Sequence, residues 1–338
     1  MSTSNPDRKP LKMVECASCK TKVFIPSDLL PFASVPCTRC GHPVIMPMQL
    51  RQFELRNIIA SGGMGTVYRA FDTMLLREVA VKMLKKEVIG DEEVLHSFYR
   101  EARACAALNH TNIIHIYTFD ELDHQPYLVM ELADFDSLDA WIERDQRVPE
   151  LQVLDIGIKV ASALDTALKH NLLHRDIKPG NILFNSDGEP KLVDFGLARI
   201  AEADEAEHEF IVWGTPYYVA PEKIRREKEN FLSDMYSLGG TLYHALTGHV
   251  PFEAATVEEV ITAHVNTPPT PPNQVVPEIS QPTSDALVTA MAKLPASRFQ
   301  SYDDFIMALT AARSQLLVRQ FNMNQTGSED AGKGWWQR

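Results

Sequence analysis

The pattern of apolar and polar residues changes character near Asp139. Before that point, three segments alternate or run apolar with β-branched residues, which predicts strands: Phe53–Ala60, Thr66–Ala70 and Glu78–Met83. One helical segment interrupts them, near Glu92–Leu108. Beyond Asp139 the apolar residues recur with helical spacing, for example in Gln152–Lys169, Asp234–Thr247 and Ser301–Gln315. We therefore predict an α+β protein with a small β-rich lobe, a larger α-helical lobe and a ligand site in the crevice between them.

The chain divides into four segments on the same pattern. Residues 1–13 are predicted to be a flexible tail, and residues 14–47 hold a cysteine cluster. The main body covers residues 53–313, with the two lobes at 53–132 and 133–313. Residues 314–338 turn polar and are expected to form a second tail.

Composition and charge narrow the functional classes. Hydrophobic residues make up 45% and charged residues 23% of the 338 positions, which is typical of a soluble globular protein. The net charge of −12 disfavours nucleic acid or an anionic membrane as a partner. We predict no membrane span, because no apolar run approaches the roughly 18 residues that a bilayer requires. The N-terminus has no apolar signal core, so we expect a cytoplasmic location.

Four of the five cysteines are crowded into two CxxC pairs, Cys16/Cys19 and Cys37/Cys40. Each pair can present two thiolates from one tight turn, and two such turns complete a tetrahedral site suited to Zn²⁺. Gly41 supplies backbone freedom beside the second pair. Four protein ligands leave no open position, so we predict a structural zinc ribbon rather than a catalytic zinc. The alternative is a redox pair or two unrelated thiol pairs.

A glycine-rich turn and an apolar strand that ends on a lysine suggest a phosphate site. Gly62, Gly63 and Gly65 lie between two predicted strands, so they close a hairpin and do not begin the helix of a dinucleotide fold. Lys82 ends the run Val79–Lys82, and Glu101 lies on the apolar stripe of the following helix. A carboxylate facing inward needs a cation, and Lys82 is the natural candidate. A structural ion pair is the alternative.

A second hairpin gathers oxygen ligands and charges. The run from His174 to Asn181 precedes a predicted strand, and a turn and a second strand lead to Asp194. Folding this hairpin brings Asn181 and Asp194 to one end, where two oxygen side chains suit Mg²⁺. Asp176 can orient and deprotonate an incoming hydroxyl, and Lys178 can neutralise a transferring phosphoryl group.

In order and spacing, the strings VAVK, HRDIKPGN, DFG and GTPYYVAPE resemble those of bacterial Hanks-type serine/threonine protein kinases over residues 53–313. The resemblance implies a two-lobed kinase fold, ATP with Mg²⁺ (or Mn²⁺) as cofactors, and protein substrates phosphorylated on serine or threonine. It makes Asp176 the catalytic base and Lys178, Asn181 and Thr215 its catalytic partners. It also expects Glu222 to pair with Arg298, and Asp234 to support the catalytic loop.

The same resemblance assigns the nucleotide contacts. Met130 is the expected gatekeeper, and the residues from Glu131 to Ala133 form the hinge that binds adenine. The full set comprises Ile59, Ala60, Ser61, Gly62, Gly63, Met64, Gly65, Thr66, Val67, Ala80, Lys82, Glu101, Met130, Glu131, Ala133 and Asp194. Ala60 stands where the family usually has a glycine, and Asp134–Asp136 replaces a Gly-Gly turn after the hinge. Asn181 and Asp194 are assigned to Mg²⁺.

Three functions remain open on these residues. The first is an active kinase. The second is a pseudokinase scaffold that uses the zinc ribbon to dock a partner, which the complete catalytic set disfavours. The third is a nucleic-acid adaptor, for which Lys20, Lys22 and Arg39 offer too little positive charge. For the ribbon we expect docking of a regulatory protein or autoregulation.

The activation segment has an unusual composition. From Leu197 to Trp213 it contains no Ser, Thr or Tyr, whereas five acids occur there: Glu202, Asp204, Glu205, Glu207 and Glu209. The ordinary interpretation is a solvated acidic loop. The functional one is that a carboxylate pairs with Arg175 in place of a phosphate, so that the enzyme is active without phosphorylation of this segment.

Overall fold

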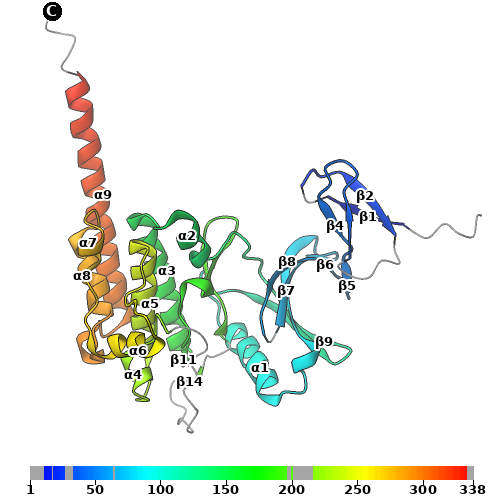
Figure 1. Cartoon of the computed structure of the whole chain (residues 1–338), viewed down its shortest axis with the longest axis horizontal. Helices are drawn as coiled ribbons and strands as arrows, with labels where there is room; N and C mark the ends of the chain where they lie inside the picture. The colour runs from blue at the N-terminus through cyan, green and yellow to red at the C-terminus, as the bar shows by residue number, and fades with distance from the viewer. Residues whose placement is uncertain are drawn as a thin grey trace, which may run out of the picture. The chain divides into compact units, whose positions relative to one another are not determined.

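The computed structural model describes residues 11–16, 18–26, 33–63, 65–195, 199–200 and 216–332 (Figure 1). The chain separates into two compact units. The first contains Met1–His96 and Ile116–Leu132, and the second contains Ser97–His115 and Ala133–Arg338. Helix α1 (Glu92–Ala106) begins in the first unit and ends in the second. The predicted α+β class is confirmed, with a β-rich first unit and a helical second unit.

The first unit is built around a six-stranded sheet with the order β5-β6-β7-β8-β10-β9, in which all neighbours are antiparallel. Leu55, Val81 and Tyr127 are fully buried in its core. The 3₁₀ helix η1 (Lys86–Val88) follows β8. The strands of the sheet are β5 (Met48–Leu50), β6 (Phe53–Ser61), β7 (Gly65–Asp72), β8 (Arg77–Leu84), β9 (Ile116–Leu122) and β10 (Gln125–Met130).

A small module precedes this sheet in the same unit and consists of two antiparallel strand pairs. Strand β1 (Leu11–Glu15) pairs with β2 (Lys22–Pro26), and β3 (Ser34–Pro36) pairs with β4 (Pro43–Ile45). Alternate residues of β2, Val23 and Ile25, are buried, as expected for a strand with one covered face. We call residues 11–46 the four-cysteine module.

The second unit is mainly helical. Its major helices are α2 (Leu138–Asp145), α3 (Glu150–Lys169), α5 (Phe231–Thr247), α6 (Val257–Asn266), α8 (Gln281–Ala290) and α9 (Tyr302–Gly332). The short elements are β11 (Leu172–Leu173), η2 (Pro179–Asn181), β12 (Ile182–Phe184), β13 (Pro190–Leu192), β14 (Arg199–Ile200), α4 (Pro221–Ile224), α7 (Pro272–Val275) and η4 (Pro295–Ser297).

Helix α5 is the central element of this unit, because nearly all of its residues are buried. Its ends follow local rules: the side chain of Asn230 accepts a hydrogen bond from the N–H of Leu232, and Gly248 closes the helix with φ of 76°. Helix α3 packs against α5 and α9 at Gly157, where a Cβ would meet the side chains of Leu242 and Leu309.

The final helix is longer than the sequence pattern indicates. The periodic pattern ends near Gln315, but α9 continues to Gly332, across most of the segment whose polarity predicts a tail. In Figure 1 its red C-terminal part extends past α7 and α8. Arg313 Nε lies 2.5 Å from the Asp155 carboxylate and so ties α9 to α3. Among the described residues, no helix combines the length and apolarity needed to cross a membrane.

Candidate active site

The predicted catalytic loop, which begins at His174, is held by a buried carboxylate on α5. The Asp234 side chain accepts hydrogen bonds from the backbone N–H groups of His174 (2.8 Å) and Arg175 (2.7 Å). Arg175 has a φ of 68°, a left-handed conformation that costs free energy in a non-glycine residue. The two hydrogen bonds stabilise this conformation, so the supporting role expected of Asp234 is confirmed.

His174 links this loop to the chain beyond the catalytic hairpin. Its Nε2 lies 3.0 Å from the carbonyl oxygen of Val193, and its Nδ1 accepts from the N–H of Asp176 at 3.3 Å. A carbonyl oxygen can only accept, so the ring donates from Nε2. The ring packs on Phe195 with centroids 4.5 Å apart, and both side chains are fully buried.

Three predicted catalytic side chains meet at Asp176. Its Oδ2 accepts hydrogen bonds from Lys178 Nζ at 2.7 Å and from Asn181 Nδ2 at 3.0 Å. Asn181 Nδ2 also donates to the Asp176 carbonyl at 2.8 Å. The Asp176 and Lys178 side chains remain 28% and 44% exposed, so a substrate can reach both groups. The arrangement orients a carboxylate and places an ammonium beside it.

The hairpin of β12 and β13 has the predicted form. Ile182 pairs with Leu192, and the N–H of Val193 donates to the carbonyl of Asn181 at 3.0 Å. Asn181 and Asp194 therefore flank the same end of the hairpin. The amide nitrogen of Asn181 donates to Asp176, so its amide oxygen is the atom that can serve as a ligand. Amide and carboxylate oxygens are the donor types that Mg²⁺ prefers.

Behind the loop lies a buried ion pair, which confirms the predicted pairing of Glu222 with Arg298. The two side chains contact through two bonds of 2.7 and 2.8 Å, and Ser233 donates to Glu222 at 2.7 Å. Burial raises the pKa of Glu222, but these hydrogen bonds and the arginine charge outweigh it and hold that pKa below its usual value.

One contact in this region was not predicted. Lys223, on α4, donates from Nζ to the carbonyl of Arg175 at 2.9 Å and so joins α4 to the catalytic loop. The motif identifies Glu222 but carries no signal for the next residue, because the contact depends on how α4 packs.

The glycine-rich turn closes a hairpin between β6 and β7, as predicted. The N–H of Gly62 donates to the carbonyl of Gly65 at 2.9 Å, and Lys85 Nζ donates to the carbonyl of Gly62 at 2.6 Å. A Cβ on Gly65 would lie 2.7 Å from the carbonyl oxygen of Met83, so only glycine fits there. The loop is thus a compact turn that can bring backbone N–H groups close to a phosphate.

Lys82 lies on the central strand β8, opposite Val67 on β7 and Leu128 on β10. The predicted adenine-side residues Ala80 and Met130 face each other across β8 and β10. The pairing of Lys82 with Glu101 stays a prediction, because the Glu101 side chain lies outside the described part of the structure.

Other predicted residues also fall outside the described ranges. They are Met64, Thr215 and the acidic residues of the activation segment from Glu202 to Glu209.

The two CxxC pairs form two turns of the same design. In each turn the N–H of the residue four places after the first cysteine donates to that cysteine's carbonyl at 2.9 Å: Lys20 to Cys16, and Gly41 to Cys37. Both of these residues have positive φ, 60° at Lys20 and 74° at Gly41. The sequence indicates the turn at Gly41 but not its counterpart, because lysine rarely adopts this conformation.

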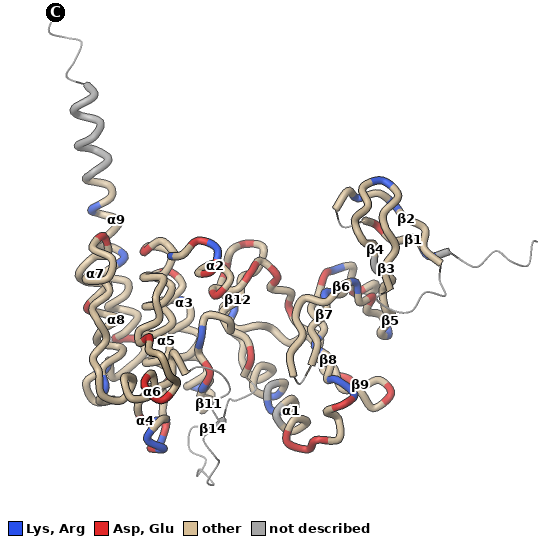
Figure 2. The backbone as a smooth tube through the Cα atoms, viewed as in Figure 1, with Lys and Arg blue, Asp and Glu red and all other residues tan. Residues whose placement is uncertain are grey.

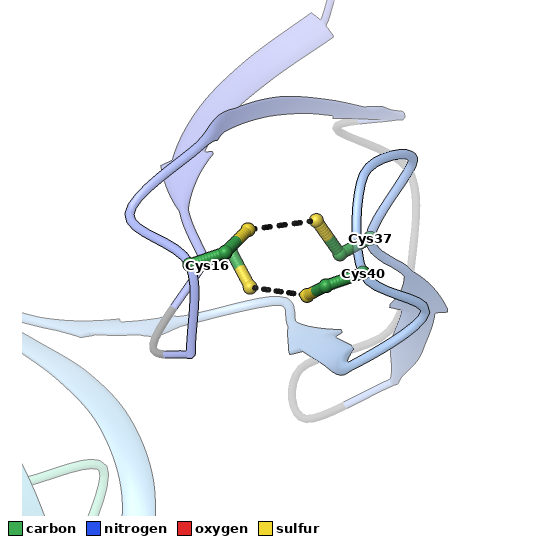
Figure 3. Close-up of side chains that lie close together, drawn as sticks. Cys16, Cys37 and Cys40 are labelled. Atoms are coloured by element: carbon green, nitrogen blue, oxygen red, sulfur yellow. Dashed lines mark hydrogen bonds between the residues drawn. The ribbon is translucent and has the colours of Figure 1, made fainter.

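The four thiols converge on one point, and Figure 3 shows the side chains of Cys16, Cys37 and Cys40 directed toward one another. All four sulfur atoms lie within 4.8 Å of one another, and both the Cys16–Cys40 and the Cys19–Cys37 pairs are 3.6 Å apart. A tetrahedral zinc with bonds of about 2.3 Å requires sulfurs about 3.8 Å apart, so the donor set fits Zn²⁺. Hydrogen bonds with the side chain and backbone of Thr21 lower the pKa of Cys19 to about 6. A backbone hydrogen bond also lowers the pKa of Cys40, but the neighbouring Cys19 thiol and burial outweigh it and raise that pKa to about 11. The convergence of the sulfur atoms therefore carries the site, and the pKa values do not.

Charged residues offer little support for a nucleic-acid interface. Figure 2 shows Lys and Arg interspersed with Asp and Glu along both units of the described chain rather than gathered in one basic stripe. A nucleic-acid site would require such a stripe.

Comparison with known proteins agrees with this geometry. Residues 53–308 match the family described as protein kinase domain. A probable serine/threonine-protein kinase of Clostridium perfringens is 35% identical over 255 residues, which are 75% of this chain and 37% of that protein.

Two mycobacterial proteins are similarly related. Serine/threonine-protein kinase PknA of Mycobacterium tuberculosis is 35% identical over 268 residues, covering 78% of this chain and 62% of PknA. Serine/threonine-protein kinase PknB of Mycobacterium leprae is 36% identical over 255 residues, covering 74% and 41%. The chain therefore spans less than two thirds of the length of each of these relatives. The four-cysteine module precedes the matched family region.

Proposed function

Because this chain belongs to the protein kinase domain family, we propose that it transfers the γ-phosphoryl group of ATP to serine or threonine hydroxyls of protein substrates. The observation that carries the proposal is the Asp176 carboxylate, held by Lys178 and Asn181 in a loop anchored on Asp234. The names of the related proteins support the choice of serine and threonine.

The step follows from these positions. The substrate hydroxyl oxygen forms a bond to the γ-phosphorus while its proton passes to Asp176, and the bond from the γ-phosphorus to the β–γ bridging oxygen breaks to release ADP. Lys178 neutralises charge on the transferring group. Asn181 and Asp194 would hold Mg²⁺, which would supply further charge neutralisation on the phosphate oxygens. The glycine-rich loop and Lys82 are assigned to the remaining phosphates.

Transfer of labelled phosphate to a generic protein substrate tests this proposal. We expect Asp176→Ala and Asp194→Asn to lose at least about 10²-fold in rate while keeping the wild-type thermal unfolding curve. Asp187→Ala is the matched control, because Asp187 is an exposed carboxylate in the turn of the same hairpin. An Asp176→Ala variant with near-normal turnover would show that the assignment is wrong, and a wild-type chain that binds ATP without turnover would instead favour the pseudokinase.

We also propose a structural zinc in the four-cysteine module, supported by the convergence of four thiols at tetrahedral spacing. Elemental analysis of protein purified without added metal should find one zinc per chain. Cys37→Ser should abolish it, whereas Cys105→Ser, which changes a buried cysteine in the second unit, should retain it. Protein free of both zinc and iron would refute the site.

A further inference from the structure

Strand β5 belongs to the kinase sheet by its hydrogen bonding. It pairs antiparallel with β6 as the sixth, edge strand, with Met48 opposite Leu55 and Leu50 opposite Phe53. The Leu50 side chain is only 1% exposed and joins the core of the sheet, and Met48 packs against that core. The segment that follows the four-cysteine module is therefore part of the six-stranded sheet and of its core.

The same stretch of chain is anchored in the four-cysteine module immediately before β5. Only Met46 and Pro47 separate β4 from β5. Met46 is 5% exposed in a core that includes Cys16 and Cys37, and its N–H donates to the carbonyl of Ala33 at 2.8 Å. The two cores are therefore joined without a flexible linker.

A second contact joins the module to β6 directly. Lys12 Nζ on β1 lies 3.8 Å from the Glu54 carboxylate on β6. Glu54 also pairs with Arg56, which pairs with Glu78 on β8. Each half-exposed pair contributes little by itself, so the strand pairing and the burial of Leu50 carry most of the connection.

Strand β6 links this junction to the glycine-rich loop. It begins at Phe53, opposite Leu50, and ends at Ser61, directly before Gly62 and Gly63. A change in how the start of β6 is held can therefore alter the order of the loop at its other end. Strand β6 contains two register shifts, which weaken the influence of its first residues on the glycine-rich loop but leave the strand continuous.

The physical reason for a metal dependence is the size of the four-cysteine module. A segment of fewer than about 40 residues seldom folds without a metal or disulfides, so the free energy of metal binding becomes the free energy of folding. Without the metal, Met46 loses its anchor, and β5 retains only three paired residues at a sheet edge. A strand that short is stable only with support from its neighbours.

We propose that the four-cysteine module is a metal-dependent clasp: its zinc holds β5 on β6 and thereby sets the order of the glycine-rich loop and the affinity for nucleotide. The nucleotide part rests on the proposed kinase function. The strand part rests on the contacts of β5 and on the zinc proposed for the four-cysteine module.

Hydrogen–deuterium exchange on the full chain tests the clasp. The zinc-loaded protein is compared with protein stripped by a chelator and with a Cys37→Ser, Cys40→Ser double variant. We expect both metal-free forms to lose protection in residues 48–61 as well as in residues 11–46, with unchanged protection in α3 and α5. The dissociation constant of a fluorescent ATP analogue should rise on the order of fivefold. Loss of protection confined to residues 11–46 would overturn the clasp.

An insertion variant provides the matched control. Placing Gly-Gly-Ser-Gly between Met46 and Pro47 leaves both cores intact but breaks their rigid connection. In this variant, removing zinc should still expose residues 11–45 but should no longer change protection in β6; loss of β6 protection here would also overturn the clasp. A chain that binds no ATP would contradict the proposed kinase function. The hydrogen–deuterium exchange experiment contains no nucleotide, so its result would still test whether the module holds β5 on β6.

Discussion

At the scale of single residues, Arg298 shows how one side chain can organise a region. Its guanidinium contacts Glu222 on α4, the carbonyl of Leu232 on α5 at 2.7 Å and the carbonyl of Ala292 after α8 at 2.8 Å. The Arg298 and Glu222 side chains are 0% and 4% exposed. A charge buried this deeply is tolerated because a carboxylate and backbone carbonyls accept hydrogen bonds from its guanidinium.

Removing this arginine should therefore be costly. We expect Arg298→Met to lower the free energy of unfolding by about 3–5 kcal/mol, because it leaves Glu222 buried without its cation. Arg144→Met is the control, since Arg144 pairs with Asp136 at 2.9 Å with side chains 56% and 50% exposed, and should cost less than about 1 kcal/mol. Urea unfolding of both variants gives the comparison, and equal effects would contradict the buried-charge argument.

The effect of Arg298→Met should also depend on pH. The pKa of Glu222 is lowered in the folded protein, so the pair contributes stability above the ordinary pKa of glutamate and loses it as the pH falls below that value. The difference in the free energy of unfolding between wild type and Arg298→Met should therefore become smaller in acid. Unfolding curves at pH 7 and near pH 4 measure it, and a gap that widens in acid would show that the sign is wrong.

At the scale of elements, the ends of helices and hairpins depend on backbone conformations that few residues tolerate. Gly248 and Gly188 both have positive φ, 76° and 74°. Gly248 ends α5, where a Cβ would collide with the carbonyl oxygen of Gln146. Gly188 lies in the turn between β12 and β13, where nothing lies within 4 Å of an added Cβ. Comparing the two positions therefore separates the free-energy cost of a positive φ from the free-energy cost of a steric clash.

Alanine at these positions should give different results. Gly188→Ala should cost about 1 kcal/mol, which is the left-handed penalty alone. Gly248→Ala should cost clearly more, because the collision with Gln146 forces the end of α5 to move. Thermal unfolding of both variants shows which one is less stable. A Gly188→Ala protein that is less stable than Gly248→Ala would contradict the prediction.

At the scale of the whole molecule, we expect control of activity to depend on segments that precede and follow the predicted catalytic loop. The activation segment has no hydroxyl residue from Leu197 to Trp213 and carries five carboxylates. Arg175, beside the proposed catalytic base Asp176, is anchored through its N–H by Asp234 and through its carbonyl by Lys223. The backbone of Arg175 is thus positioned by groups that require no phosphate.

We therefore predict that the enzyme is active as synthesised. Phosphatase treatment should leave the initial rate unchanged, because no hydroxyl between residues 197 and 213 can carry a phosphate. Changing the five acids to their amides should lower the rate and its sensitivity to salt, since a carboxylate provides a screened charge in place of a phosphate. A long lag that disappears after incubation with ATP, or full activity in the amide variant, would contradict the prediction.

The local features of this protein follow from its sequence. Residue spacing predicts three of the six strands of the large sheet, β6, β7 and β8, together with the long helices α3 and α5. It also predicts the hairpin that brings Asn181 and Asp194 to one end. The two CxxC pairs predict the convergence of thiols that the structure shows. These features are predictable because each depends on residues within one element or one turn. There, the side-chain types and the spacing of the apolar residues decide the conformation.

Only the tertiary structure decided the contacts between elements. The bond from Lys223 to the Arg175 carbonyl and the joining of β5 to β6 have no marker in the sequence. Such contacts depend on how two separately formed elements pack, and many residues of similar size would pack equally well at each position. The same sequence that predicts a zinc ribbon beside a kinase therefore leaves their connection to be decided by the packing of Met46 in one core and Leu50 in the other.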